Sequence, residues 1–232
     1  MLTLKELSYK VQNKTLLHPL STTFYPNTLY TLIGPNGSGK TTLLKTLNGI
    51  YRPSRGEVLW KETPLHLRTR KEMSRIVTLI PQEHNRNFDF TVEEMVHLGT
   101  YVHGNNQIDH ALESVHCLHL KSRYLSTLSQ GELQRIYIAR SLASDSPIFL
   151  CDEPTANLDI RHQKEIWRLL KRIAKLGKTV IVATHDLHAA KTTSDRTLIL
   201  SNGNLTYQGK TPDILSPDII QETFQVTEET FL

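Results

Sequence analysis

The sequence predicts an α/β fold in which a helical block interrupts a β-rich chain. Two continuous apolar runs, 148–151 and 179–183, are typical of strands inside a parallel sheet. A glycine-rich loop follows a third such run, 29–33, and opens onto apolar residues at helical spacing. Between 84 and 143 the pattern is mainly helical. Strands and helices that alternate around a parallel sheet define the α/β class.

The composition is that of an ordinary globular protein. The 232 residues allow one large domain or a domain with an insertion. Lys and Arg exceed Asp and Glu by 27 − 23 = +4, which suits a phosphate-binding protein without showing one. No basic tract indicates a nucleic-acid surface, and no run approaches the ~18 apolar residues of a membrane span. The N-terminus has no signal-peptide core. Because no apolar run is long enough to span a membrane, we expect any membrane role to be peripheral.

The cysteines and histidines show no ligand pattern. Cys117 and Cys151 are the two cysteines, and both lie in apolar surroundings. Two unpatterned cysteines predict buried thiols in a reducing compartment rather than a disulfide framework. The eleven histidines show no spacing typical of a metal site.

The first 33 residues predict short strands separated by turns. Strands are expected at 2–7, 20–24 and 29–33, with a turn at 12–14. Tyr9 lies in this region, and from the residues alone the simplest interpretation is an aromatic side chain on a half-buried strand.

The loop after the third strand matches the phosphate-binding pattern G-x-x-x-x-G-K-[ST] without a mismatch. Glycines let the backbone curl so that several N–H groups point at one anion. Lys40 would place a charge between the β- and γ-phosphates, and the Thr41 hydroxyl would ligate Mg²⁺. A purely structural turn would need neither residue. The predicted nucleotide contacts of this loop are Gly34, Pro35, Asn36, Gly37, Ser38, Gly39, Lys40, Thr41 and Thr42.

The middle of the chain predicts two more strands and then the helical block. Strands are expected at 57–60 and 76–80, the second ending at Pro81-Gln82, with a charged helical stretch at 68–75 between them. The block's expected helices are 91–99, 108–120 and 129–143, and its polar loop is 104–107.

The last third returns to alternating elements. We expect helices at 161–175 and 187–191, and one amphipathic helix over 212–224. Asn202-Gly203 predicts a hairpin turn between strands 197–201 and 205–207.

Polar residues follow three of the predicted core strands. Asp152 and Glu153 end the run 148–151, where open α/β sheets bind ligands. Beside a phosphate loop, Asp152 is placed to hold Mg²⁺ and Glu153 to deprotonate a water that faces the γ-phosphate. His185 could donate a hydrogen bond to that phosphate, and Gln82 could report the nucleotide's state to another surface. The alternatives are a polar strand end, a structural histidine and a simple loop amide.

The segment Leu128-Ser129-Gln130-Gly131-Glu132 decides between these interpretations. Alone, Ser129 and Glu132 form a capping box at a helix start. Together with the phosphate loop, Gln82, 152–155, 157–159 and His185, in that order, the segment resembles the LSGGQ signature of ATP-binding cassette (ABC) ATPases. The resemblance covers essentially the whole chain.

The resemblance implies a single ABC ATPase domain over 1–232. Its RecA-like mixed sheet and N-terminal antiparallel β subdomain would occupy 1–83 and 144–232, and the helical signature subdomain 84–143. ATP and Mg²⁺ would be the cofactors.

The resemblance also implies a role for each matching residue. Tyr9 would stack on adenine, Gln82 would contact Mg²⁺ or the attacking water, and Thr41 and Asp152 would hold the metal. Glu153 would be the catalytic base and His185 the γ-phosphate switch.

The remaining matching residues imply a dimer. Ser129 and Gly131 would bind the γ-phosphate of ATP held by a second copy of the chain, and Asp159 would lie in the interprotomer D-loop. Two copies would therefore enclose two ATP molecules head to tail.

Two signature positions depart from the family pattern. Gln130 replaces the first glycine and Glu132 the glutamine. The Glu is a familiar variant, whereas Gln130 puts the turnover rate in question.

A further set of residues in this sequence, here called the subfamily pattern, is similar to that of ATPases from iron-siderophore, haem and cobalamin importers. It consists of 88–99 with Pro64-Leu65 and Arg75 upstream. It implies a peripheral ATPase on the cytoplasmic face of the cell (inner) membrane, which drives uptake through permease subunits served by a substrate-binding protein and has no nucleic-acid partner. Zinc or manganese importers, a soluble ABC ATPase acting on ribosomes or DNA, and a cassette that only binds nucleotide are the alternatives.

Overall fold

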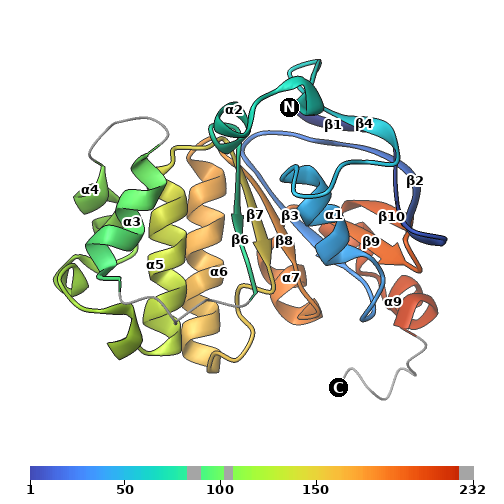
Figure 1. The fold of residues 1–232 in the computed structure, drawn as a ribbon. Coiled ribbons are helices and arrows are strands. Elements are labelled where there is room, and N and C mark those ends of the chain that lie inside the picture. The colour runs from blue at the N-terminus through green and yellow to red at the C-terminus, as the bar shows by residue number, and fades with distance from the viewer. Residues whose placement is uncertain (83–89, 102–106, 225–232) are drawn as a thin grey trace.

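The computed structural model describes residues 1–82, 90–101 and 107–224. Residues 104–106 of the predicted polar loop lie outside this range, as do Phe88 and Asp89 of the subfamily pattern and the domain boundary expected at 83/84. Within the described chain, two sheets and the helices around them form the predicted α/β architecture (Figure 1).

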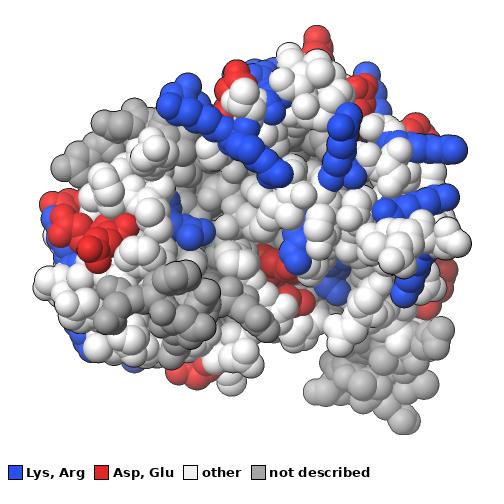
Figure 2. All heavy atoms as spheres, in the orientation of Figure 1, with Lys and Arg blue, Asp and Glu red and all other residues white. Residues whose placement is uncertain are grey.

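The smaller sheet is antiparallel and comes from the N-terminal part of the chain. Its strand order is β2-β1-β4-β5. The strands are β1 (Leu2–Val11), β2 (Lys14–Phe24), β4 (Arg55–Trp60) and β5 (Thr63–Pro64). Exposed basic side chains, among them Lys5, Lys10 and Arg55, lie on these strands, and Figure 2 shows Lys and Arg gathered on this part of the surface. One further lysine of this sheet, Lys14, lines the site described below.

The larger sheet carries the functional elements. Its order is β10-β9-β3-β8-β7-β6, and its neighbours are parallel except for the β9–β10 hairpin. The strands are β3 (Thr28–Ile33), β6 (Val77–Ile80), β7 (Ile148–Asp152), β8 (Thr179–Ala183), β9 (Arg196–Ser201) and β10 (Asn204–Lys210). The hairpin turns at Asn202-Gly203, where both residues have positive φ, as the sequence predicts.

The two faces of the central strands belong to different hydrophobic cores. In β8, Val180 and Val182 pack in the core that contains the helical block, whereas Ile181 and Ala183 pack in the core beneath the antiparallel sheet. Successive side chains of a strand point to opposite faces. A strand covered on both faces is therefore apolar throughout, which explains the uninterrupted run 179–183.

The helices cover this sheet on both sides (Figure 1). Those near the antiparallel sheet and the phosphate loop are α1 (Lys40–Leu47) and α2 (Arg70–Ser74). The helical block and the helix after β7 contribute α3 (Val92–Thr100), α4 (Ile108–Ser114), α5 (Gln130–Ala143) and α6 (Ile160–Lys175). The last helices are α7 (Leu187–Thr193), α8 (Thr211–Ile214) and α9 (Pro217–Phe224).

Two predicted helices are each divided in the structure. The helix expected over 108–120 ends at Ser114, because the chain turns at His116 with φ 57°, and a 3₁₀ turn follows at Leu118–Leu120. The helix expected over 212–224 is α8 and α9, because a proline disfavours helical backbone at the residue before it, here Ser216. Both single-helix predictions were wrong, although most apolar residues of the two segments are buried.

Both cysteines are fully buried, as predicted. Burial raises the pKa of the Cys151 thiol far above its ordinary value, so this thiol is inert at neutral pH. In the described part of the chain, no helix has the length and apolar character needed to cross a membrane.

Candidate active site

The predicted site residues follow the carboxyl ends of neighbouring parallel strands. Asp152 of β7 pairs with Ala183 of β8, and β3 lies on the other side of β8. The residues that come directly after these strands therefore meet at one edge of the sheet. They are the loop 34–39, Glu153 and His185, and Gln82 follows β6 at the same edge.

The phosphate loop is bent tightly against the β9–β10 hairpin. A Cβ atom on Gly34 would lie 2.0 Å from the carbonyl oxygen of Leu200. The backbone N–H of Gly203 donates to the Ser38 carbonyl oxygen over 3.0 Å. Gly39 has φ 105° at the N-terminus of α1. Glycine is therefore required at position 34 for the close approach to Leu200 and at position 39 for the positive φ.

A Gly34→Ala substitution tests that close approach. We expect it to displace the loop and to lower the free energy of unfolding by about 1–3 kcal/mol, the usual cost of overpacking. Gly37→Ala is the matched control, because Gly37 also has positive φ but an added Cβ would meet nothing within 4 Å. Urea unfolding of both variants measures the difference, and equal losses would show that the contact with Leu200 has no role.

Lys40 is buried and held over the loop. Its Nζ donates to the carbonyl oxygens of Gly34, over 2.6 Å, and Pro35, over 3.1 Å. Burial lowers the pKa of Lys40, and the nearby carboxylates of Glu153 and Asp152 partly oppose this shift. The loop's own backbone thus positions a cation at the mouth of the loop.

Asp152 and Thr41 face each other across the site. The Thr41 hydroxyl donates to Asp152 Oδ1 over 3.1 Å. Burial raises the pKa of the Asp152 carboxyl, opposed by the Thr41 hydrogen bond and by Lys45 and Lys40. A desolvated carboxylate beside a hydroxyl is a ligand pair suited to a hard divalent cation.

The raised pKa of Asp152 predicts a pH-dependent stability. In the absence of nucleotide and divalent cations, the folded chain holds this proton more tightly than the unfolded chain. Stability therefore falls as the pH rises from the ordinary Asp pKa through the raised one. We expect Asp152→Asn to increase Tm at neutral pH and to lose that advantage below about pH 4. Thermal melts at the two pH values check this, and an advantage that does not depend on pH would contradict it.

Glu153 and His185 form a pair. Glu153 Oε2 lies 2.9 Å from His185 Nδ1, and the two side chains are 12% and 72% exposed. Glu153 has φ 48°, and its N–H donates to the Ala183 carbonyl oxygen over 2.9 Å. A non-glycine residue in this conformation is strained, and such strain is concentrated at functional sites.

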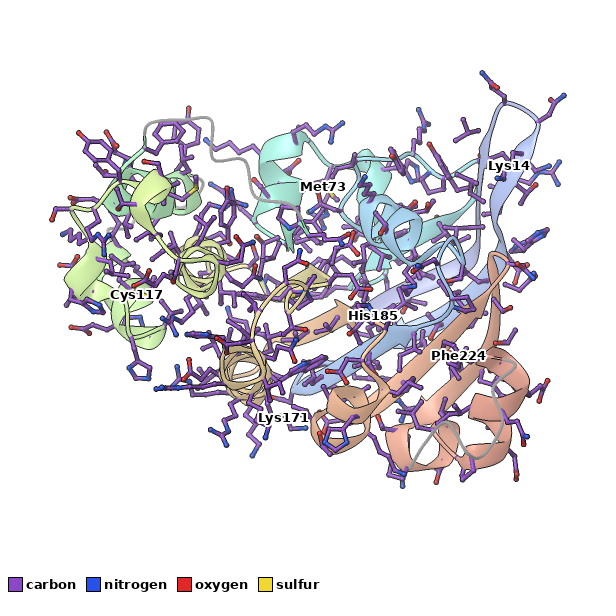
Figure 3. All side chains as sticks on the ribbon, turned by 90° about the horizontal axis from the view of Figure 1, so that it is seen from below. Lys14, Met73, Cys117, Lys171, His185 and Phe224 are labelled. Carbon is purple, nitrogen blue, oxygen red and sulfur yellow. The ribbon has the colours of Figure 1, made fainter. Side chains whose placement is uncertain are left out.

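These groups line one cleft of about 840 Å³. It brings together the predicted residues Gly34, Pro35, Asn36, Gly37, Ser38, Gly39, Lys40, Thr41, Thr42, Gln82, Asp152, Glu153 and His185. Four further lining residues were not predicted from the sequence, namely Lys14, Leu16, Leu187 and Phe224. Figure 3 labels Lys14 at the β1–β2 hairpin, His185 near the centre and Phe224 on α9. The walls thus come from segments far apart in the chain, which no local motif marks.

Tyr9 does not line the cleft. Its ring stacks on Tyr51, with centroids 5.0 Å apart and planes inclined by 4°, and it packs at the edge of the core beneath the antiparallel sheet. The adenine contact stays a prediction, and this packing favours the alternative of a half-buried aromatic on a strand.

Ser129 and Gly131 also lie outside this cleft, at the start of α5. Ser129 caps the helix, since its hydroxyl accepts from the Glu132 N–H over 3.3 Å. Glu132 Oε2 accepts from both the N–H and the hydroxyl of Ser129 over 2.8 Å. These two hydrogen bonds lower the pKa of Glu132. Glu132, which replaces the glutamine of the family pattern, therefore completes the capping box as an ionised acceptor near the helix N-terminus.

A family model described as ABC transporter matches residues 17–156, more than half of the chain. The chain belongs to the ABC transporter family. This assignment makes it an ATP-binding cassette with ATPase activity.

The curated relatives are ATP-binding subunits of importers. The hemin import ATP-binding protein HmuV of Bradyrhizobium diazoefficiens is 36% identical over 96% of this chain and 87% of its own. The iron(3+)-hydroxamate import ATP-binding protein FhuC of Bacillus subtilis is 32% identical over 98% and 89%. The predicted resemblance to such ATPases is confirmed.

Solved structures confirm the predicted cassette fold. The cbiO1 protein of Clostridium perfringens, part of the ABC transporter complex cbiONQ, has a TM-score of 0.84 at 27% identity, covering 99% of this chain and 96% of that one. A bacterial ABC transporter cassette whose structure is dimeric has a TM-score of 0.79 at 26% identity, covering 91% and 99%.

Proposed function

We propose that this ABC ATPase energises the uptake of an iron complex, such as a siderophore or haem, through two membrane permease subunits. The observation that carries the proposal is the cleft, in which a phosphate loop, Gln82, Asp152, Glu153 and His185 meet. The names of the relatives, which specify hemin and iron(3+)-hydroxamate import, support the cargo.

The loop fits the phosphates of ATP. Ser38 Oγ is buried and has no hydrogen-bond partner in the described chain, which leaves a donor for a bound oxygen. Lys40 Nζ, whose partners in the structure are two carbonyl oxygens, supplies the cation. Thr41 and Asp152 would hold Mg²⁺ with Gln82 nearby, and the ion would neutralise phosphate charge when bound.

Glu153 is the proposed general base. It stands at the strand end beside the metal ligand Asp152, and the Glu153–His185 contact orients its carboxylate. Glu153 would take the proton of a water placed against the γ-phosphate. His185, 72% exposed, would turn one ring nitrogen toward that phosphate.

The site is proposed to be completed by a second copy of the chain. Ser129 and Gly131 do not line the chain's own cleft, and Ser129 is exposed on the surface at a helix N-terminus. Helix N-termini favour anions. The dimeric form of a similar cassette supports a head-to-tail pair in which each signature meets the other chain's ATP.

The membrane partners and location follow from the same proposal. The chain would dock on the cytoplasmic side of the inner membrane and couple through Gln82 to permeases, which receive cargo from a binding protein. It would act as one domain, with the helical subdomain moving against the core. Tyr9 would have to leave the Tyr51 stack, or use its other face, to contact adenine.

Transport assays test the cargo. Cells that lack this chain should fail to take up radiolabelled iron as ferric hydroxamate or hemin. Wild-type chain should restore uptake of at least one, and Glu153→Gln should restore neither. Restored uptake of cobalamin, zinc or manganese alone would overturn the iron assignment while leaving the importer class intact.

A further inference from the structure

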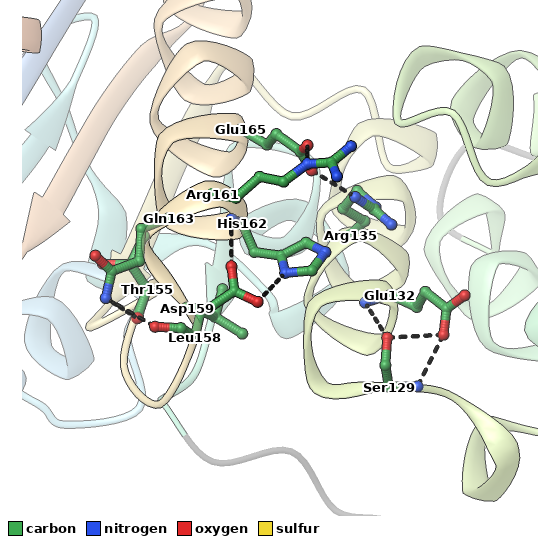
Figure 4. Close-up of polar contacts among 10 residues, drawn as sticks. All are labelled: Ser129, Glu132, Arg135, Thr155, Leu158, Asp159, Arg161, His162, Gln163 and Glu165. Carbon is green, nitrogen blue, oxygen red and sulfur yellow. Dashed lines mark hydrogen bonds and ion pairs between the residues drawn. The ribbon is translucent and has the colours of Figure 1, made fainter.

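The first turn of α6 connects two segments of the chain that are distant in sequence. One is the D-loop, here defined as 155–159, which ends at the N-cap of α6. The other is the N-terminus of α5 with Ser129 and Gly131. Figure 4 shows the side chains of this turn between the two segments.

His162 bonds to the D-loop twice. Its backbone N–H donates to Asp159 Oδ1 over 2.9 Å, and its Nδ1 lies 2.8 Å from Asp159 Oδ2. The same bonds lower the pKa of Asp159. An ionised carboxylate only accepts hydrogen bonds, so Nδ1 must carry the proton and donate. The ring orientation is thereby fixed by Asp159.

The same ring lies against Gly131 of the signature. A Cβ atom on Gly131 would stand 3.0 Å from His162 Cδ2 and 3.1 Å from Cγ. Only a glycine leaves room for the ring at this distance without a shift of the neighbour. The His162 ring therefore contacts the D-loop through Nδ1 and lies against the signature through Cδ2 and Cγ.

Further contacts hold both segments to α6. Gln163 Nε2 donates to the Leu158 carbonyl oxygen over 3.0 Å. One turn along, Arg135 of α5 pairs with Glu165 over 2.9 Å. The D-loop and the signature are thus both attached to one rigid helix.

We propose that His162 is a positioning residue that fixes the D-loop relative to the signature, so that both approach the partner protomer as one preformed surface. The inference rests on the proposed head-to-tail dimer, in which Ser129, Gly131 and the D-loop all face the second chain. A surface that is already ordered loses less conformational freedom on association, so it dimerises at a lower ATP concentration. His162 contacts neither ATP nor the attacking water in this scheme.

The test separates dimer formation from ATP binding to one chain. It uses the full chain carrying Glu153→Gln, which should accumulate the ATP-bound dimer. His162→Phe keeps a ring beside Gly131 but removes the donor to Asp159. His162→Asn keeps a donor near the position of Nδ1 but removes the ring. Arg161→Ala is the matched control, because the Arg161 side chain is 85% exposed and pairs only with Glu165 among the side-chain contacts that the structure defines.

We expect His162→Phe to raise the ATP concentration for half-maximal dimerisation, measured by sedimentation, about fivefold or more, since it loses a hydrogen bond to a charged group. His162→Asn should lie between this variant and the parent, and Arg161→Ala should match the parent. Binding of a fluorescent ATP analogue to dilute monomer should be the same in all four chains.

Two results would overturn the inference. One is dimerisation by His162→Phe at the parent's ATP concentration. The other is an equal loss of monomer ATP binding in both His162 variants, which would indicate a general structural role. Failure of the Glu153→Gln parent itself to dimerise with ATP would instead contradict the head-to-tail dimer of the proposed function.

Discussion

Substitution of Glu153 by Gln is expected to reduce steady-state ATP hydrolysis by roughly 10²–10⁴-fold, the usual contribution of a general base. Gln has the same shape and can still accept from His185, but it cannot take a proton from water. Binding depends on the phosphate loop, where Lys40 and its partners are unchanged. Phosphate release measures turnover, and a fluorescent ATP analogue measures binding.

The matched control for this substitution is Glu113→Gln. Glu113 is an exposed carboxylate of α4 that does not line the cleft. The control should keep wild-type turnover, so that the loss in Glu153→Gln cannot be attributed to one fewer negative charge. Near-normal hydrolysis by Glu153→Gln would remove Glu153 from the role of base and with it the proposed mechanism.

The parts of the site that could be predicted from the sequence are those that local chain geometry determines. Gly34 to Thr41 must curl around an anion because the glycines and Lys40 occur at fixed spacing. Asp152 and Glu153 could be placed because a buried parallel strand ends where they begin, and parallel strands end at one edge. His185 and Gln82 follow by the same reasoning, and all of them line the cleft.

The parts that could not be predicted depend on contacts between distant segments. Lys14 and Leu16 line the cleft because the antiparallel sheet folds over the loop, and nothing in their own sequence indicates this. Tyr9 is a second case of a contact between distant segments, and its adenine contact stays a prediction. A family position suggested a ligand contact, but Tyr51, 42 positions later, offers its ring a partner within the chain.

The divided helices have a similar cause. Apolar spacing continues through Val115 and Leu118, so the periodicity predicted one helix. The backbone instead reverses at His116, and Cys117 N–H donates to the Leu112 carbonyl oxygen over 2.8 Å. Burial of both halves against the same core satisfies the pattern without a continuous helix. Hydrophobic periodicity thus reports which side chains are buried more reliably than where a helix ends.

Mixing two inactive variants is expected to restore ATP hydrolysis. Lys40→Ala removes the cation of the phosphate loop, and Ser129→Arg places a bulky group at the start of α5. Each variant alone has no intact site. In a mixed head-to-tail dimer, the wild-type loop of one chain meets the wild-type signature of the other. A second composite site in the same dimer carries both defects.

The expected rate distinguishes a shared site from one built within a single chain. Equimolar chains that pair at random give half mixed dimers, each with one intact site of two, so about a quarter of the wild-type rate should return. A companion Ser129→Ala variant measures the lost helix cap alone, about 1 kcal/mol of stability, and its melting curve shows whether Ser129→Arg fails to fold. If both variants fold and their mixture stays inactive, Ser129 acts within its own chain or not at all. Recovery of about a quarter of the wild-type rate would mean that the cleft of one chain is only half of a working site, even though it contains the loop, the metal ligands and the base.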